Sequence, residues 1–218
     1  MTLLVQREAV WTVTLDRPAR ANALSADLVE DLHGVLDEAV AARPGALVLR
    51  GNDRHFSAGF DLNGLGEETD ATLAHRFLRI GLLLERLLAA PFATVAVADG
   101  AAVGAGADLV VHCDHRLVAP SVQLRFPGSD FGVRLGAARR HELGVSLATG
   151  RPDELGTVLA GAVPGRPSHD ADRALAELAR SVAVPGLHAR LTAYAATTRT
   201  GTRTRTCLLY TSPSPRDS

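Results

Sequence analysis

The chain is poor in several residue types, and each shortage excludes a class of protein. It has 218 residues and two cysteines, Cys113 and Cys207, which cannot make a disulfide framework, so we expect a reducing compartment. Its formal net charge of −1 gives no electrostatic reason to expect nucleic acid or an anionic membrane as a partner. It contains no uncharged apolar run of about 18 residues and lacks the basic start of a signal peptide. We therefore expect a cytoplasmic globular protein that binds neither membranes nor nucleic acids.

Hydrophobic residues, by contrast, make up 46% of the chain, which is enough for one sizeable core. Strands are predicted over 10–15, 46–50, 92–97 and 116–119, and helices after Ser25, over 73–84, over 105–113 and over 171–182. This order predicts an α/β core over 1–150 and a helical C-terminal section over 151–199. Residues 200–218 show no periodicity and look like a translated cloning adapter, so we interpret them as a disordered, non-native tail that replaces or cuts the natural C-terminus.

Two glycine-rich stretches, residues 56–62 and 100–109, are the most informative part of the chain. Each follows a strand-like run and offers backbone N–H groups with little side-chain cover. Two such N–H groups, brought together from distant parts of the chain, can stabilise an oxyanion on a carbonyl substrate. Each stretch taken alone also fits an ordinary turn or close helix–strand packing.

Two carboxylates lie beside these stretches in the sequence. Asp108 falls in the first turn of the predicted helix, three residues after Ala105, and Asp130 lies in the glycine-containing loop 125–132. If they lie near one oxyanion site, they can divide general-base and general-acid work, and mutual repulsion and burial raise the pKa of at least one. The structural alternatives are a charge at a helix N-terminus for Asp108 and a solvated turn residue for Asp130.

Dinucleotide and metal sites fit the sequence poorly. Gly104 and Gly106 follow a strand and precede a helix, but Leu109 stands where the third glycine of the dinucleotide fingerprint belongs. The polar residues of 112–115 are consecutive, so their side chains diverge and cannot converge on one metal ion. We expect no metal and no cofactor.

The glycine stretches, together with residues 15–24, Cys113-Asp114 and residues 126–132, resemble the enoyl-CoA hydratase/isomerase (crotonase) family. The resemblance runs from about residue 13 to residue 198. It implies a crotonase-like spiral of ββα units with a small helical C-terminal section, assembled as a homotrimer or a dimer of trimers. It also implies an acyl-CoA substrate, with coenzyme A as part of the substrate.

The resemblance assigns roles to particular residues. The backbone N–H groups of Phe60 and Ala105 become the oxyanion donors, and the two catalytic glutamates of the family fall on Asp108 and Asp130. The substrate-binding residues it implies lie in three segments: Arg20, Ala21, Ala23; Ala58, Gly59, Phe60, Asp61, Leu62, Asn63; and Gly104, Ala105.

The chain departs from the hydratase pattern at both carboxylates, because aspartate is shorter than glutamate by one methylene and catalysis is sensitive to displacements of about 1 Å. Residues 133–140 also lack the proline- and glycine-rich run common in hydratases. Hydration of a 2-enoyl-CoA is the first expectation, and double-bond isomerisation, which needs one carboxylate, is the second. Thioester hydrolysis, decarboxylation and acyl-CoA binding without catalysis stay open as alternatives.

Overall fold

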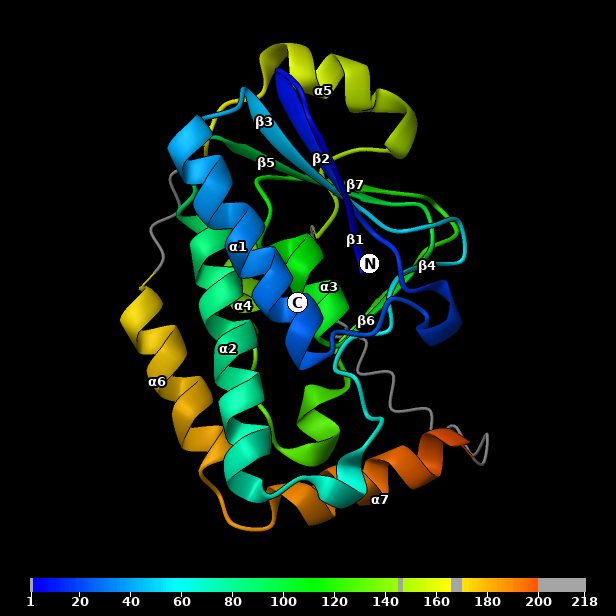
Figure 1. Ribbon diagram of the computed structural model, residues 1–218, viewed down its shortest axis with the longest axis vertical. Coiled ribbons are helices and arrows are strands. Elements are labelled where there is room, and N and C mark those ends of the chain that lie inside the picture. The colour runs from blue at the N-terminus through cyan, green and yellow to red at the C-terminus, as the bar shows by residue number, and fades with distance from the viewer. Residues whose placement is uncertain (1, 145–146, 166–169, 200–218) are drawn as a thin grey trace, which may run out of the picture.

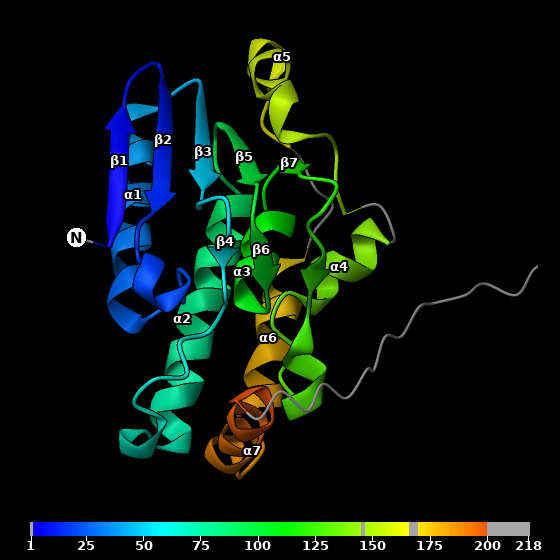
Figure 2. The same cartoon turned by 90° about the vertical axis from the view of Figure 1, so that its right-hand side faces the viewer.

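The computed structural model describes residues 2–144, 147–165 and 170–199, so the predicted tail over 200–218 lies outside the described residues. Its larger sheet has the strand order β1-β2-β3-β5-β7, with β1 antiparallel to β2 and the other pairs parallel (Figures 1 and 2). A smaller parallel sheet has the order β4-β6-β8. The strands are β1 (Leu3–Arg7), β2 (Val10–Leu15), β3 (Ala46–Arg50), β4 (His55–Ser57), β5 (Ala93–Ala98), β6 (Ala101–Val103), β7 (His115–Val118) and β8 (Leu124–Arg125).

Over the first half of the chain, each helix follows a pair of strands. They are α1 (Ala26–Ala42), α2 (Asp70–Leu88), α3 (Ala105–Val111), α4 (Ala137–Leu143), α5 (Leu155–Gly161), α6 (Ala171–Val182) and α7 (Leu187–Arg199). Short 3₁₀ turns are η1 (Pro18–Arg20), η2 (Leu65–Glu67), η3 (Pro127–Phe131) and η4 (Pro152–Glu154).

The central strands of the larger sheet are apolar on both faces, because α1 and α2 pack against one face and α5 packs against the other (Figure 1). In β3, Leu47 and Leu49 join the main core, which α1 and α2 also line. Val48, between them, points to the opposite face and packs in a smaller cluster with Leu155 and Leu159 of α5. The continuous apolar run at 46–49 is therefore buried on both sides, and the strand predicted over 46–50 is confirmed.

The first helix begins where the sequence predicts. The Leu28 N–H donates to Ser25 Oγ at 3.3 Å, which satisfies one of the donors that a helix leaves free at its start. Its apolar stripe, which includes Leu28, Leu32 and Leu36, is buried against the core.

The small sheet places the two glycine-rich stretches side by side. Strands β4 and β6 are parallel neighbours; β4 contains the first residues of one stretch, and β6 lies within the other. Because parallel strands end at the same edge of their sheet, both stretches leave from one edge (Figure 2). Gly104 then turns the chain, with φ +54°, into the start of α3.

Helices α5, α6 and α7 form the helical C-terminal section of the predicted fold class. Gly81 of α2 lies so close to α6 that an added Cβ would be 2.5 Å from a methyl group of Leu178. Helix α7 is tied to the start of α2 and to η3: the His188 N–H donates to Asp70 Oδ1 at 2.7 Å, and Arg190 Nε donates to the Phe131 carbonyl at 2.9 Å. A division of the chain near residue 150 stays a prediction.

Candidate active site

The two glycine-rich stretches touch at Gly59. Its φ of +84° is a left-handed conformation that glycine adopts without strain. A Cβ atom there would collide with the Val103 carbonyl oxygen and would lie 3.1 Å from the Ala105 nitrogen. Only a residue without a side chain lets the loop after β4 approach the start of α3 this closely.

Phe60 and Ala105, the predicted oxyanion donors, follow this contact on the two chain segments. The neighbours of the Phe60 N–H are engaged: the Gly59 carbonyl accepts from the Leu24 N–H at 2.7 Å, and the Asp61 N–H donates to the Leu24 carbonyl at 3.1 Å. Ala105 is the first residue of α3, where an N–H has no partner inside the helix. Within the part of the chain that the structure describes, neither N–H has a backbone acceptor. Their use as oxyanion donors stays a prediction.

The Phe60 side chain is held by α2. Its ring stacks on Phe77 with centroids 4.3 Å apart, and the Arg76 guanidinium lies 4.2 Å from its centroid. These contacts restrain the backbone around the Phe60 N–H.

The segments predicted to bind coenzyme A lie together. The Ala58 N–H donates to the Ala21 carbonyl at 2.9 Å, and Arg20 Nη1 donates to Asn63 Oδ1 at 2.9 Å. Arg20 is exposed, whereas Ala23 is buried and Leu62 is half-buried against the main core.

The framework of these segments is built by Arg17, Asn22 and Ser57. The sequence assigned no role to these three residues. Arg17 Nη1 pairs with Asp61 Oδ2 at 3.1 Å, and Ser57 Oγ donates to the Asn22 carbonyl at 2.8 Å. Asn22 itself is fully buried at φ +54°, and its Nδ2 donates to the His55 carbonyl at 3.1 Å. An asparagine tolerates this backbone better than most residues, which is a signal that the sequence carries.

Asp108 is buried one turn into α3, with 3% of its surface exposed. Its carboxylate accepts a hydrogen bond from Arg140 of α4, and Gly136 packs directly against it. Burial raises the pKa of Asp108 to about 7, although the charge and hydrogen bond of Arg140 act in the opposite direction. A carboxyl group with this pKa exchanges protons readily near neutral pH.

Asp130 differs from Asp108 in its exposure and in its contacts. It is exposed on η3, whereas the buried Asp108 is in contact with Arg140. Its charge, after burial, helps to raise the pKa of Tyr194 on α7. Of the two carboxylates predicted to share the proton transfers, Asp108 is buried and Asp130 is not. Asp108 is instead in contact with Arg140, to which the sequence assigned no role.

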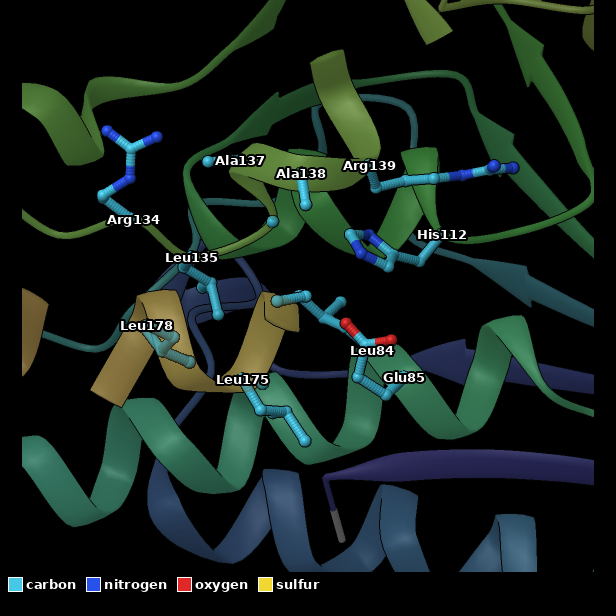
Figure 3. A pocket seen from close by; sticks show the side chains of 13 residues that line it. Leu84, Glu85, His112, Arg134, Leu135, Ala137, Ala138, Arg139, Leu175 and Leu178 are labelled. Carbon is cyan, nitrogen blue, oxygen red and sulfur yellow. The ribbon is translucent and has the colours of Figure 1, made fainter. Parts of the chain in front are cut away.

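A pocket next to this region is formed by other residues. Figure 3 shows it between α2, α4 and α6, with the apolar side chains of Leu84, Leu135 and Leu178 beside the ring of His112, while the side chain of Arg139 extends away from them. Its lining includes neither proposed oxyanion donor and does not include Asp108. We therefore do not assign it to the substrate.

The polar residues around 112–115 make separate structural hydrogen bonds. His112 Nδ1 lies 2.7 Å from the Asp108 carbonyl, and Asp114 Oδ2 accepts from the Thr94 N–H and hydroxyl at 2.9 and 3.0 Å. Burial raises the pKa of the Cys113 thiol to about 12, so it is a poor metal ligand. Over 2–144, 147–165 and 170–199, no three His, Cys, Asp or Glu residues are grouped to hold a metal ion, and no helix there is both long and apolar enough to span a membrane.

A model of the enoyl-CoA hydratase/isomerase family matches residues 6–144, which include both glycine-rich stretches and Asp108. The chain belongs to this family. The fold agrees: a crystal structure of a family member from Bordetella parapertussis superposes with a TM-score of 0.82 and 32% sequence identity, covering 90% of this chain and 99% of that one. The predicted family and fold class are thereby confirmed.

Curated relatives of the family carry several names. A "Probable enoyl-CoA hydratase" (echA6) of Mycobacterium tuberculosis is 39% identical over 132 residues, which are 61% of this chain and 52% of the relative. Human ethylmalonyl-CoA decarboxylase is 32% identical over 128 residues, which are 57% of this chain and 41% of that protein. The chain thus spans about half the length of the first curated relatives that it matches.

Proposed function

We propose that this family member acts on an acyl-CoA thioester and stabilises the enolate formed from it. The thioester oxygen accepts hydrogen bonds from the Phe60 and Ala105 N–H groups, which lower the energy of the developing negative charge. The observation that carries this proposal is the contact of Gly59 with Val103 and the Ala105 nitrogen, since it brings the two donor segments together.

The coenzyme A portion lies along the segments that contain Arg20, Ala21, Ala23 and residues 58–63. Two hydrogen bonds, one between Ala58 and Ala21 and one between Arg20 and Asn63, support this placement, because they join the two segments side by side. The exposed guanidinium of Arg20 supplies a positive charge for a phosphate group.

Double-bond isomerisation is the reaction that this geometry supports best. Asp108 takes a proton from C2 of a 3-enoyl-CoA, the electrons pass into the enolate, and the same carboxyl group returns the proton to C4 to give the conjugated 2-enoyl-CoA. One buried carboxyl group with a pKa of about 7 is sufficient for both transfers. Hydration, the first expectation from the sequence, assigns work to Asp130, which is exposed.

The experiment is a pair of absorbance assays on the purified protein. With a 3-enoyl-CoA we expect the conjugated enoyl-thioester absorbance to appear; with crotonyl-CoA we expect little loss of that absorbance. Asp108→Asn should lower isomerisation by about 100-fold or more, and Asp130→Asn, the matched exposed control, by less than about threefold. Loss of crotonyl-CoA absorbance that needs both aspartates would favour hydration, and turnover unaffected by Asp108→Asn would remove Asp108 from the mechanism.

Acyl-CoA binding without turnover is the second candidate. The contact between Asp108 and Arg140 favours it, because a carboxylate engaged by a guanidinium is a weaker base. Calorimetric binding of acyl-CoA with no product from enoyl-, carboxyacyl- or saturated acyl-CoA would support this candidate; the same substrate panel detects decarboxylation and thioester hydrolysis. A homotrimer or dimer of trimers is part of the proposal and is measured by analytical ultracentrifugation.

A further inference from the structure

Arg140 makes three contacts that fix its guanidinium beside Asp108. Nη1 donates to the Asp108 carboxylate and, at 2.9 Å, to the Leu135 carbonyl. The guanidinium carbon also lies 4.5 Å from the centroid of the Phe126 ring. Hydrogen bonds and ring contact together hold a side chain that is only 22% exposed.

The start of α4 is built for this contact. Gly136 precedes α4 with φ +61°, and a Cβ atom on it would collide with Asp108 Oδ1. The absence of a side chain lets the chain pass directly over the carboxylate. Arg140 lies four residues later, and residues four apart share one face of a helix, so its guanidinium returns to the same carboxylate.

Four other charged or titratable groups lie on Asp108's own segment or on the elements around it. On its own helix, His112 Nδ1 contacts the Asp108 backbone carbonyl, and Arg139 of α4 donates to the Val111 carbonyl at 3.3 Å. Glu85 of α2 lines the pocket that His112 and Arg139 also line, and Asp130 of η3 is exposed. Among the residues that the structure describes, Arg140 is the cation whose ion pair with the Asp108 carboxylate is seen.

We propose that Arg140 is a positioning residue for Asp108, which favours the anionic form of the carboxyl group against the effect of burial and fixes the orientation of the carboxylate. What the anion is used for rests on the proposed function; the effect of Arg140 on the carboxyl group does not. In isomerisation, an anionic Asp108 takes the proton from C2 first, which is the order that the reaction requires.

Removing the guanidinium takes away the charge and the hydrogen bond that lower the pKa of Asp108, so burial raises that pKa without their opposition. Arg140→Met should therefore raise the pKa of Asp108, and the ascending low-pH limb of the pH–rate profile, where the base loses its proton, should move to higher pH by roughly 1 to 3 units. The loss should fall on kcat, with KM little changed, because the coenzyme A segments are untouched. Arg140→Lys retains the charge but not the planar fork, so it should restore most of the pH profile and part of kcat.

The direct test needs no substrate. Carbon-13 NMR of aspartate-labelled protein follows the Asp108 carboxyl group across pH, and Asp108→Asn identifies its signal. Arg140→Met should move the titration upward, Arg140→Lys should move it less, and Arg139→Met, the matched control on the next residue, should leave it in place. Circular dichroism confirms that each variant is folded, and Arg140→Gln replaces Arg140→Met if the latter does not fold.

The outcomes separate this inference from the proposed function. An Asp108 titration that is the same in the folded Arg140→Met or Arg140→Gln variant as in the unmodified protein would overturn the inference. A titration that moves as expected, in a protein that turns over no acyl-CoA, supports the positioning role and overturns the proposed activity.

Discussion

Gly59 and Val103 are in contact through backbone alone: the loop after β4 passes against the Val103 carbonyl at a distance that leaves no room for a Cβ atom on Gly59. The two residues belong to separate glycine-rich stretches, so their contact determines how the predicted donors Phe60 and Ala105 are placed relative to each other.

Gly59→Ala should therefore destabilise the protein and weaken acyl-CoA binding together. We expect the free energy of unfolding to fall by about 2 kcal/mol or more, because the substitution adds both left-handed strain and a collision with backbone. Chemical denaturation and calorimetric binding measure the two effects. Gly64→Ala is the matched control, since Gly64 has φ +75° but no atom within 4 Å of an added Cβ. Equal losses in the two variants would contradict a role for the Gly59–Val103 contact.

The ionisation of Asp108 should make stability fall as pH rises. The folded protein retains the Asp108 proton up to about pH 7, whereas an unfolded aspartate releases it near its ordinary pKa of 3.8. Between these values the folded state binds more protons, so raising the pH favours unfolding. From pH 5 to pH 8, this group should cost on the order of 2 kcal/mol.

Asp108→Asn removes that titration. Urea denaturation of both proteins at pH 5 and pH 8 should show a smaller decrease in the variant, while Asp130→Asn, an exposed control, should decrease like the unmodified protein. Parallel decreases in the unmodified protein and Asp108→Asn would show that the raised pKa is wrong.

Arg17→Gln should lower stability more than Arg7→Gln. Burial acts to raise the pKa of Asp61, but hydrogen bonds from Asn63 and Arg17 outweigh it and hold that pKa below its usual range. The side chains of Arg17 and Asp61 are 19% and 7% exposed, so loss of Arg17 leaves a buried carboxylate with less compensation and should cost about 1–3 kcal/mol at pH 7.

Arg7 and Glu38 supply the exposed comparison, with side chains 45% and 55% exposed, and Arg7→Gln should cost less than about 1 kcal/mol. The stability that the lowered pKa of Asp61 contributes is present above the unfolded pKa and is lost as pH falls through the folded one. The Arg17→Gln penalty should therefore shrink in denaturation at about pH 3. A penalty that does not change with pH would mean that Arg17 acts through packing alone.

Two helical glycines should respond to alanine in opposite directions. Gly34 of α1 is exposed with no atom within 4 Å of an added Cβ, so Gly34→Ala should stabilise the protein by about 0.5–1 kcal/mol. Gly81 of α2 lies under Leu178 of α6, so Gly81→Ala should destabilise it by about 1–3 kcal/mol. Melting temperatures of the two variants give the comparison, and a stabilising Gly81→Ala would mean that the Leu178 side chain moves aside for the added methyl group.

The parts of the fold that the sequence predicts well are those with periodicity of their own. Strand β2, strand β3 and the capped start of α1 were predicted from alternation, apolar runs and Ser25. Strands β4, β6 and β8 have two or three residues each, too few for a period to appear, and they exist because they pair with one another.

The site was predicted in the same uneven way. Phe60, Ala105 and Asp108 follow from motifs that are continuous in the sequence. The Arg140–Asp108 contact joins residues 32 apart through the close approach at Gly136, and no local pattern indicates such a contact. Asp130 lies in the glycine-containing loop 125–132, where spacing alone does not say whether a carboxylate is buried.

The neighbouring positions of β4 and β6 have a consequence for how this protein can change. Parallel neighbours in a sheet lie about 4.8 Å apart, and backbone hydrogen bonds set this spacing whatever side chains the strands carry. Side-chain substitutions in β4 and β6 that preserve this pairing should therefore leave the main chain of both glycine-rich stretches on its course.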